Sequence, residues 1–167
     1  MKRSRPNRTA SRFYRGREKL IREKKPLPSD FRARIQTRPR SGHKERELDI
    51  EGAEGSDFRL ILRQSDLNPL DFSIILAYRL PKSNLLFRLR RYNGRSHEHT
   101  NTIEGDKFYD FHIHEATERY QEMGAREDTY AKATDRFADF HQAISCMLKD
   151  CGFEVAQDPQ RRLFEEI

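Results

Sequence analysis

From residue 58 onward, apolar and polar residues alternate along several segments of the sequence. The alternating segments are FRLILRQS (58–65), LDFSIILAYR (70–79), LLFRLRRY (85–92) and KFYDFHIH (107–114). A period of two places alternate side chains on opposite faces of a β-strand. The turn sequences Asn68-Pro69 and PKSN (81–84) are too short for a parallel crossover, which needs about a dozen residues. The sequence therefore predicts an antiparallel β-meander of about four strands.

A helical period replaces this alternation between Asp135 and Asp150. Thr134 is suited to cap the start of the predicted helix, and Gly152 is suited to end it in a left-handed conformation. An amphipathic helix can cover the apolar face of an antiparallel sheet and leave the other face open to solvent. Its apolar residues recur at helical spacing, namely Phe137, Phe140, Ile144, Met147 and Leu148.

The predicted fold class is α+β, with the meander packed against this C-terminal helix. We assign residues 58–155 to the core domain and residues 156–167 to a C-terminal tail. Ile74 and Phe140 are expected to be buried, because both lie on apolar faces of their elements.

The charge of the chain is distributed unevenly. Residues 1–48 hold 17 lysines and arginines against 5 acidic residues, a net charge of +12, and the remaining residues hold 16 against 22, a net charge of −6. Apolar residues are sparse in the first region and prolines interrupt it, which is typical of a chain that does not pack. We therefore predict a basic, partly disordered N-terminal arm over residues 1–48 and an acidic linker over residues 49–57. A chain that starts near Gly52 should then fold by itself.

Such an arm favours nucleic acid, and single-stranded RNA above all, as its partner. Positive side chains neutralise phosphates, and the interleaved aromatic residues Phe13, Tyr14 and Phe31 could stack on bases. The alternatives are a solubilising tail or a segment that becomes ordered on an acidic protein partner. A membrane surface is not favoured, because no wide apolar face accompanies the charge. The predicted nucleic-acid-binding residues are Arg3, Arg5, Arg8, Arg12, Arg15, Arg17, Lys24, Lys25, Arg88 and Arg90.

Residues 93–114, NGRSHEHTNTIEGDKFYDFHIH, contain four of the six histidines as two His-x-His pairs. The dipeptide Asn93-Gly94 is typical of a type I′ hairpin turn. That hairpin would place Tyr92 opposite Arg95, Arg90 opposite His97 and Arg88 opposite His99. On the last strand, His112 and His114 would project from one face, because alternate residues of a strand share a face. The sequence thus predicts a sheet face that combines histidines with arginines.

Three interpretations of this histidine stretch remain open. Four imidazoles could bind a transition metal, although neighbouring arginines would repel a cation, so that no metal site and no cofactor is favoured. Histidines and arginines could instead cleave a phosphodiester without a metal, with imidazoles as acid and base. The third interpretation is an ordinary solvated strand face. The candidate catalytic residues are His112, His114, His99 and Arg90.

The acidic stretch ERELDIEGAEGSD (45–57) offers a further candidate. Glu47, Asp49 and Glu51 alternate and could bind Mg²⁺. No lysine-bearing strand in a suitable register follows them, so a solvated linker is the favoured interpretation.

The motifs RYNG, HEHTNTIEG and FHIHEATERY resemble an uncharacterised group of small prokaryotic proteins, which are often encoded beside toxin–antitoxin or mobile-element genes. The resemblance covers roughly residues 56–155 and not the arm. It implies a strand, an Asn/Gly loop, a His-x-His strand and a terminal helix, and it favours a toxin-like or defence-associated role without supplying a mechanism. The resembling residues are Arg91, Tyr92, Asn93, Gly94, His99, Asn101, Glu104, Gly105, His112 and His114.

From these observations we expect a nucleic-acid-binding protein of toxin–antitoxin or mobile-element type, with metal-independent ribonuclease activity as its candidate chemistry. The alternative is a non-enzymatic module that binds a partner protein. The sequence has no apolar run long enough to span a membrane and no apolar segment of the kind that secretory signals contain. We therefore expect a soluble, cytoplasmic protein.

Overall fold

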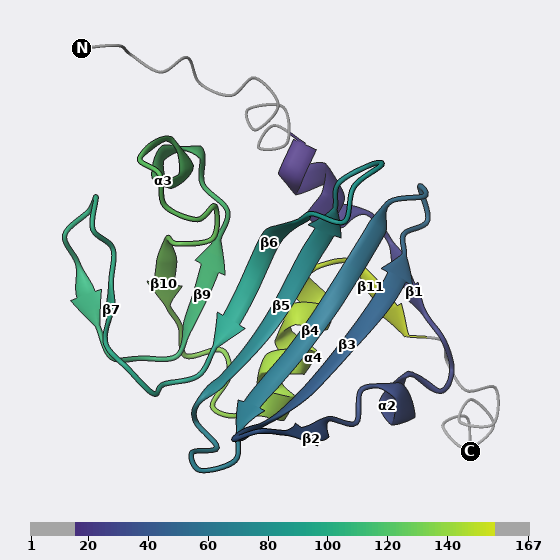
Figure 1. Ribbon diagram of the computed structural model, residues 1–167, viewed down its shortest axis with the longest axis horizontal. Coiled ribbons are helices and arrows are strands. Elements are labelled where there is room, and N and C mark those ends of the chain that lie inside the picture. Colours follow the sequence, from purple (N-terminus) through teal and green to yellow (C-terminus); the bar gives the residue numbers. More distant parts are fainter. Residues whose placement is uncertain (1–15, 156–167) are drawn as a thin grey trace, which may run out of the picture.

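The computed structural model describes residues 16–155, which form one large sheet with helices around it (Figure 1). None of the helices in this range is both long and apolar enough to cross a membrane. In chain order the elements are a helix over residues 16–22, β1 (Lys25–Leu27), α2 (Phe31–Arg34), β2 (Arg38–Arg40), β3 (His43–Glu51), β4 (Asp57–Ser65), β5 (Phe72–Arg79), β6 (Leu86–Asn93), β7 (His99–Thr100), β8 (Lys107–Phe108), β9 (His112–Glu115), α3 (Glu118–Glu122), β10 (Ala131–Ala133), α4 (Phe140–Asp150) and β11 (Phe153–Val155).

The large sheet has seven strands in the order β10-β9-β6-β5-β4-β3-β2, and every neighbouring pair is antiparallel. Helix α4 packs on one face of the sheet, behind β4 and β5 in the view of Figure 1. The opposite face of β3, β4 and β5 carries no helix in that view, and we call it the open face. The predicted α+β class and the terminal helix are confirmed, whereas the sheet has more strands than the meander that the sequence predicts.

The core lies between the sheet and α4. Leu62 lies directly opposite Ile74 on the neighbouring strand, and both side chains are at most 1% exposed. Phe140 is also buried, so the predicted burial of both Ile74 and Phe140 is confirmed. Helix α4 begins at Phe140, later than predicted, because the Asp139 side chain accepts a hydrogen bond from the Gln142 N–H at 2.7 Å and caps the helix there.

The N-terminal region of the described chain differs from the expected arm and linker. Residues 43–51 form β3, which pairs with β4 along its whole length. Charged residues hide the alternation in this strand, since only Leu48 and Ile50 supply its apolar side. Its outward-facing Glu47 and Asp49 do not form a cation site, because both carboxylates contact the Arg59 guanidinium. Further residues of this region belong to the core, namely Ile21, Leu27, Phe31 and Ile50.

A chain that starts near Gly52 would lack β1, β2 and β3 together with these core side chains. We therefore expect this truncation to abolish cooperative thermal unfolding, because β4 would become an unpaired edge and its core face would be exposed. Circular dichroism melting of the truncated and full chains checks this expectation. A sharp transition in the truncated chain would show that residues 16–51 do not contribute to the core.

Lys25 joins the two ends of the described chain. Its side chain is fully buried, and its Nζ lies 2.8 to 3.1 Å from the carbonyl oxygens of Leu20, Ile21, Glu23 and Cys151. These carbonyls belong to the end of the first helix and the residue after α4. The same ammonium lies 4.3 Å from the centre of the Phe58 ring. Beside it, β1 pairs in parallel with β11, so that residues 25–27 and 153–155 are held side by side.

Lys25→Met should lower the free energy of unfolding by about 2 to 4 kcal/mol, because several buried carbonyl oxygens lose a charged donor. Lys24→Met is the matched control, since Lys24 is exposed and pairs with Glu154 at the surface. It should change the free energy of unfolding very little, because solvent screens an exposed ion pair. Urea unfolding measures both, and equal losses would contradict the structural role assigned to Lys25.

Candidate functional site

The pairing of β6 with β9 places two histidines on the open face. In this register Asn93 lies opposite His112 and Arg91 lies opposite His114. Residues directly opposite each other share a face of the sheet. The intervening Ile113 turns to the core face. His112 and His114 therefore project together, as the His-x-His spacing predicts, but their neighbours on β6 are Arg91 and Asn93 and not the expected Arg88 and Arg90.

The predicted hairpin at Asn93-Gly94 does not form. Asn93 ends β6 and Gly94 does not have a positive φ, so that neither His97 nor His99 lies opposite β6. Glycine is required here for a different reason. Its N–H donates to the Phe72 carbonyl, and a Cβ at this position would lie 1.9 Å from the carbonyl oxygen of Leu70. A close approach of two backbone segments therefore accounts for this glycine.

A short hairpin brings His99 to the other two histidines. Its strands are β7 and β8, with His99 opposite Phe108. The loop between them closes through a hydrogen bond from the Asn101 N–H to the Asp106 carbonyl, and Gly105 in it has a φ of 81°. The segment KFYDFHIH, predicted as one strand, thus divides into β8 and β9, with the chain turning between them.

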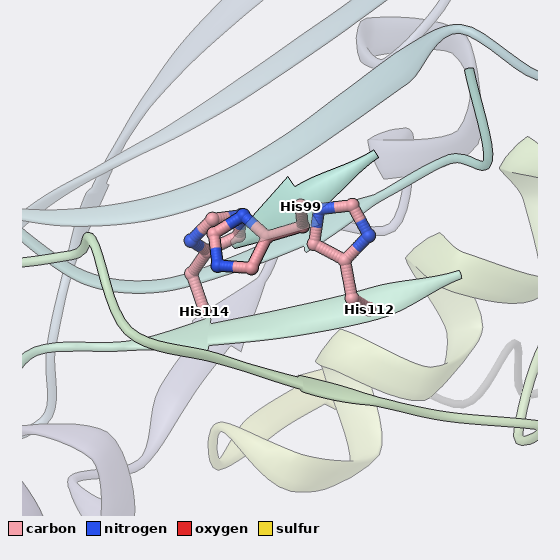
Figure 2. Close-up of side chains that lie close together, drawn as sticks. All are labelled: His99, His112 and His114. Atoms are coloured by element: carbon pink, nitrogen blue, oxygen red, sulfur yellow. The ribbon is translucent and has the colours of Figure 1, made fainter. Parts of the chain in front are cut away.

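Three imidazole rings meet between β7 and β9, as Figure 2 shows. The ring centre of His99 lies 5.2 Å from that of His112 and 4.9 Å from that of His114, and the last two are 4.9 Å apart. One ring nitrogen of each residue lies within 4.8 Å of the other two. The exposed His97 stands at the rim, with its ring centre 5.7 Å from that of His112.

Each of the three rings has one nitrogen beside a carbonyl oxygen. His112 Nδ1 lies 2.7 Å from the Asp110 carbonyl, and His114 Nδ1 lies 2.8 Å from the Asp128 carbonyl. His99 Nε2 lies 2.9 Å from Asn101 Oδ1. A carbonyl oxygen can only accept, so these nitrogens of His112 and His99 carry the protons. At His114 the Arg91 guanidinium also approaches Nδ1, at 3.1 Å, but the shorter contact to the Asp128 carbonyl places the proton there, and Nε2 then accepts from Asn93 Nδ2 at 3.4 Å. The unprotonated nitrogens are then Nε2 of His112 and His114 and Nδ1 of His99.

Asn101 holds His99 in a fixed orientation. It is 1% exposed, and its Nδ2 donates to the Ala131 carbonyl at 2.7 Å and to Asp106 at 3.0 Å. Its Oδ1 also accepts the Ala131 N–H at 3.0 Å. These partners determine which end of the amide faces His99, and so they determine the tautomer of the imidazole.

Burial keeps the three imidazoles neutral. It lowers the pKa of His112 to about 4 and lowers the pKa values of His99 and His114 below the ordinary range. The charge of Arg91 adds to the lowering at His114. His112 is fully buried, yet its Nε2 has no hydrogen-bond partner among the described residues. A buried lone pair without a partner is unusual and indicates a ligand.

The arginines are arranged differently from the prediction. A register shift in β6 skips Leu89, so that Arg90 lies opposite the buried Leu76 on the core face. It pairs with Glu115 there at 3.5 Å. Arg90 is therefore not part of the histidine cluster. Arg91 is the neighbouring cation instead, and it forms an ion pair of 3.0 Å with the fully buried Asp128. This partner offsets the repulsion that Arg91 would exert on a cation.

The other predicted nucleic-acid-binding residues have varied surroundings. Arg17 donates to the Ala116 carbonyl, and Lys25 is buried and engaged by carbonyls, so that it cannot contact a phosphate. Arg88 lies on the open face, where its guanidinium is 4.0 Å from Glu127. Lys24 remains exposed. The remaining residues lie outside the described range, namely Arg3, Arg5, Arg8, Arg12 and Arg15.

This arrangement suits coordination chemistry better than acid–base catalysis by histidine. At neutral pH an imidazole with a pKa near 4 cannot supply a proton, which excludes His112 as a general acid. Neutral imidazoles with one fixed N–H and an unprotonated second nitrogen are the form in which histidine binds metals. Among the three rings, the second nitrogen of His112 has no partner, whereas that of His114 contacts Asn93 Nδ2. Sequence reasoning missed Asn101 and Asp128, which hold the rings. The sequence offers one indication of Asn101, because Asn101 is among the residues that carry the family resemblance, and it offers none of Asp128.

No protein-family model matches this sequence, and neither a curated protein nor a solved structure matches it.

The buried imidazoles should make the metal-free protein sensitive to acid. In the unfolded chain these groups take up protons near pH 6.5, whereas folded His112 does so only near pH 4. Stability is then fully present above pH 6.5 and is lost as the pH falls toward 4. Proton uptake by His112 and His114 in the unfolded chain should together lower the free energy of unfolding by about 2 kcal/mol between pH 6.5 and 5.5.

Urea unfolding at both pH values, with chelator present, measures this loss. The variant His112→Gln/His114→Gln should show a much smaller pH dependence, and the exposed His141→Gln should retain it. A pH dependence that is equal in all three proteins would exclude neutral burial of the pair.

Proposed function

We propose that His99, His112 and His114 bind one divalent transition-metal ion, with zinc as the simplest candidate, and that this ion serves hydrolysis of a phosphodiester in nucleic acid. The buried, unpartnered Nε2 of His112 within the three-histidine cluster carries this proposal. Imidazole nitrogen suits zinc, copper, nickel and iron, and three histidines with an open fourth position are typical of catalytic zinc sites.

The three imidazole rings must move slightly closer together to bind one ion. At a zinc–nitrogen distance of about 2.0 to 2.1 Å, tetrahedral ligands are about 3.4 Å apart. The three nitrogens lie within 4.8 Å of one another, so each ring has to move by less than about 1 Å. The carbonyl partners of His112 and His114 lie on the chain beside the site, and small rotations of the rings retain these hydrogen bonds.

A metal ion here would supply a nucleophile. Coordination lowers the pKa of bound water to about 7. Such a water would attack phosphorus as the bond to the leaving oxygen breaks, and the proton that the water gives up would be available to the leaving oxygen. His97 stands at the rim of the site and is the exposed imidazole placed to accept the water's proton.

Nucleic acid is the proposed substrate because of the charge of the chain. Seventeen of the 33 lysines and arginines precede residue 49, and this region carries a net charge of +12. Phosphate neutralisation by such a region supports affinity without sequence preference. A role of toxin–antitoxin or mobile-element type, with RNA as the target, remains part of the proposal.

Isothermal titration calorimetry of the chelator-treated full-length chain with Zn²⁺ tests the metal site. We expect one ion per chain, and a thermal stabilisation of about 2.7 kcal/mol at a free zinc concentration of one hundred times Kd. His112→Gln should abolish binding, whereas His141→Gln on the surface of α4 should not. Binding well below one ion per chain, or equal binding in both variants, would overturn the proposal.

Cleavage of single-stranded RNA by the zinc-loaded chain tests the chemistry. Activity should disappear in His112→Gln and in His99→Gln.

A second candidate function, binding of a partner protein without catalysis, is favoured by an apolar groove of about 590 Å³ beside α4 that Phe31, Ile144 and Leu148 help to line. Growth inhibition that persists unchanged in His112→Gln and in His99→Gln, without RNA cleavage by any form, would support that candidate.

A further inference from the structure

Three exposed arginines on the open face have no acidic partner among the described residues. They are Arg38, Arg40 and Arg63. The other arginines of this face are neutralised, since Arg59 and Arg79 contact Asp49, Arg88 contacts Glu127 and Arg91 contacts Asp128. The available positive charge on this face is therefore concentrated on β2 and β4.

Cross-strand register connects these arginines to the histidine cluster. Directly opposite residues form one continuous row across six strands, and each step stays on the open face. The row runs Arg38, Glu45, Arg63, Ser73, Asn93, His112. Neighbouring strands are about 4.8 Å apart, so Arg63 on β4 lies about 14 Å along this row from His112 on β9.

A polar hollow lies along the same row. It has a volume of about 280 Å³, and Arg63, Ser65 and Ser73 line it together with His43 and Asp71. Ser65 Oγ accepts two backbone N–H groups at 3.2 and 3.3 Å, which leaves its hydroxyl proton available to a ligand oxygen. Guanidinium and hydroxyl groups together are typical donors to phosphate.

Glu45 lies in the row and Asp71 lies beside it, and both carboxylates contact neighbouring side chains. Glu45 contacts His43 Nε2 at 2.9 Å, and Asp71 accepts a hydrogen bond from Ser96 Oγ at 3.1 Å. Ser96 adjoins His97, so the hollow and the rim of the histidine cluster are linked through this contact. Ser73 and Asn93 are also joined, by a hydrogen bond of 3.0 Å.

We infer that a single-stranded nucleic acid crosses the open face along this row. Phosphates of its backbone contact Arg38, Arg40 and Arg63, and the strand brings a following phosphate to the accessible rim of the histidine cluster, at His97 and the half-buried His99. Arg38 and Arg63 lie in this row on either side of Glu45, and Arg40 lies next to it on β2. These groups form one narrow track, which suits one backbone and not the two backbones of a duplex. This inference rests on the proposed phosphodiester substrate, and it specifies the path of that substrate.

Fluorescence anisotropy with a labelled 12-nucleotide oligo-uridine strand and the matching DNA strand tests this path in the full-length chain. The variant Arg38→Gln/Arg40→Gln/Arg63→Gln should weaken binding at least tenfold in 100 mM salt. The slope of log affinity against log salt should fall by about 2, since each single-strand phosphate contact contributes about 0.7. Affinity for Zn²⁺ should not change.

The matched control is Arg22→Gln/Arg32→Gln/Lys149→Gln, which removes the same charge from exposed positions on three helices and not from the strands of the open face. It should change affinity less than threefold. Equal binding of RNA and DNA, or a preference for either, supports a path that contacts the backbone. Equal weakening in both triple variants, or none in the first, overturns the inference.

These measurements distinguish failure of the metal proposal from failure of the proposed strand path. Unaltered strand binding in His112→Gln, with tenfold weaker binding in the arginine variant, supports the path whether or not zinc binds. Loss of zinc binding in the arginine variant would show that the substitutions disturb the histidine cluster, and would overturn the assignment of these arginines to the strand alone.

Discussion

The register between β6 and β9 determines the position of every group in the candidate site. Four residue pairs define it, and a shift by one residue would turn His112 and His114 into the core and expose Ile113. Tyr92 holds this register from the core side. It is fully buried, its ring packs against Phe137, and its hydroxyl donates to Asp150 on α4 at 2.6 Å. The placement of the histidines on one face is thus fixed by packing on the other.

Much of the fold could be predicted because the spacing of apolar residues determines where the strands and the terminal helix form. Strands β4, β5 and β6 and helix α4 lie close to the predicted segments, since burial on one face imposes the alternation and the helical period. Strand β3 could not be predicted in this way. Most of its residues are charged, and its outward-facing acids are neutralised only by Arg59 and Arg79, which belong to other strands. A local pattern contains no information about such partners.

The candidate site was predictable in part for the same reason. The His-x-His spacing is local, and the strand period correctly predicts that His112 and His114 share a face. The predicted face of Arg90 was wrong, because the register shift at Leu89 reverses the alternation of faces along β6. The alternation of residue types in the sequence does not reveal such a shift. The carbonyl partners of His99 and His112 are local, but that of His114 comes from Asp128, and Asn101 is oriented by Ala131, so these two contacts depend on the tertiary fold. Hence the neutral state of the histidines, which favours a metal over acid–base chemistry, was not visible in the sequence.

The parallel pair of β1 and β11 has a consequence for how the protein is made. Lys25 and the Cys151 carbonyl are 126 positions apart in the chain, so β1 cannot pair and the Lys25 ammonium cannot gain its last carbonyl partner until residues 151–155 have left the ribosome. The central strands have their neighbours much earlier during synthesis. During translation the sheet can therefore assemble while the N-terminal segment still lacks its final hydrogen bonds. The last step of folding closes a loop that includes nearly the whole described chain, and the entropy of that closure opposes it. A ribosome that stalls before residue 151 would hold a sheet without this closure.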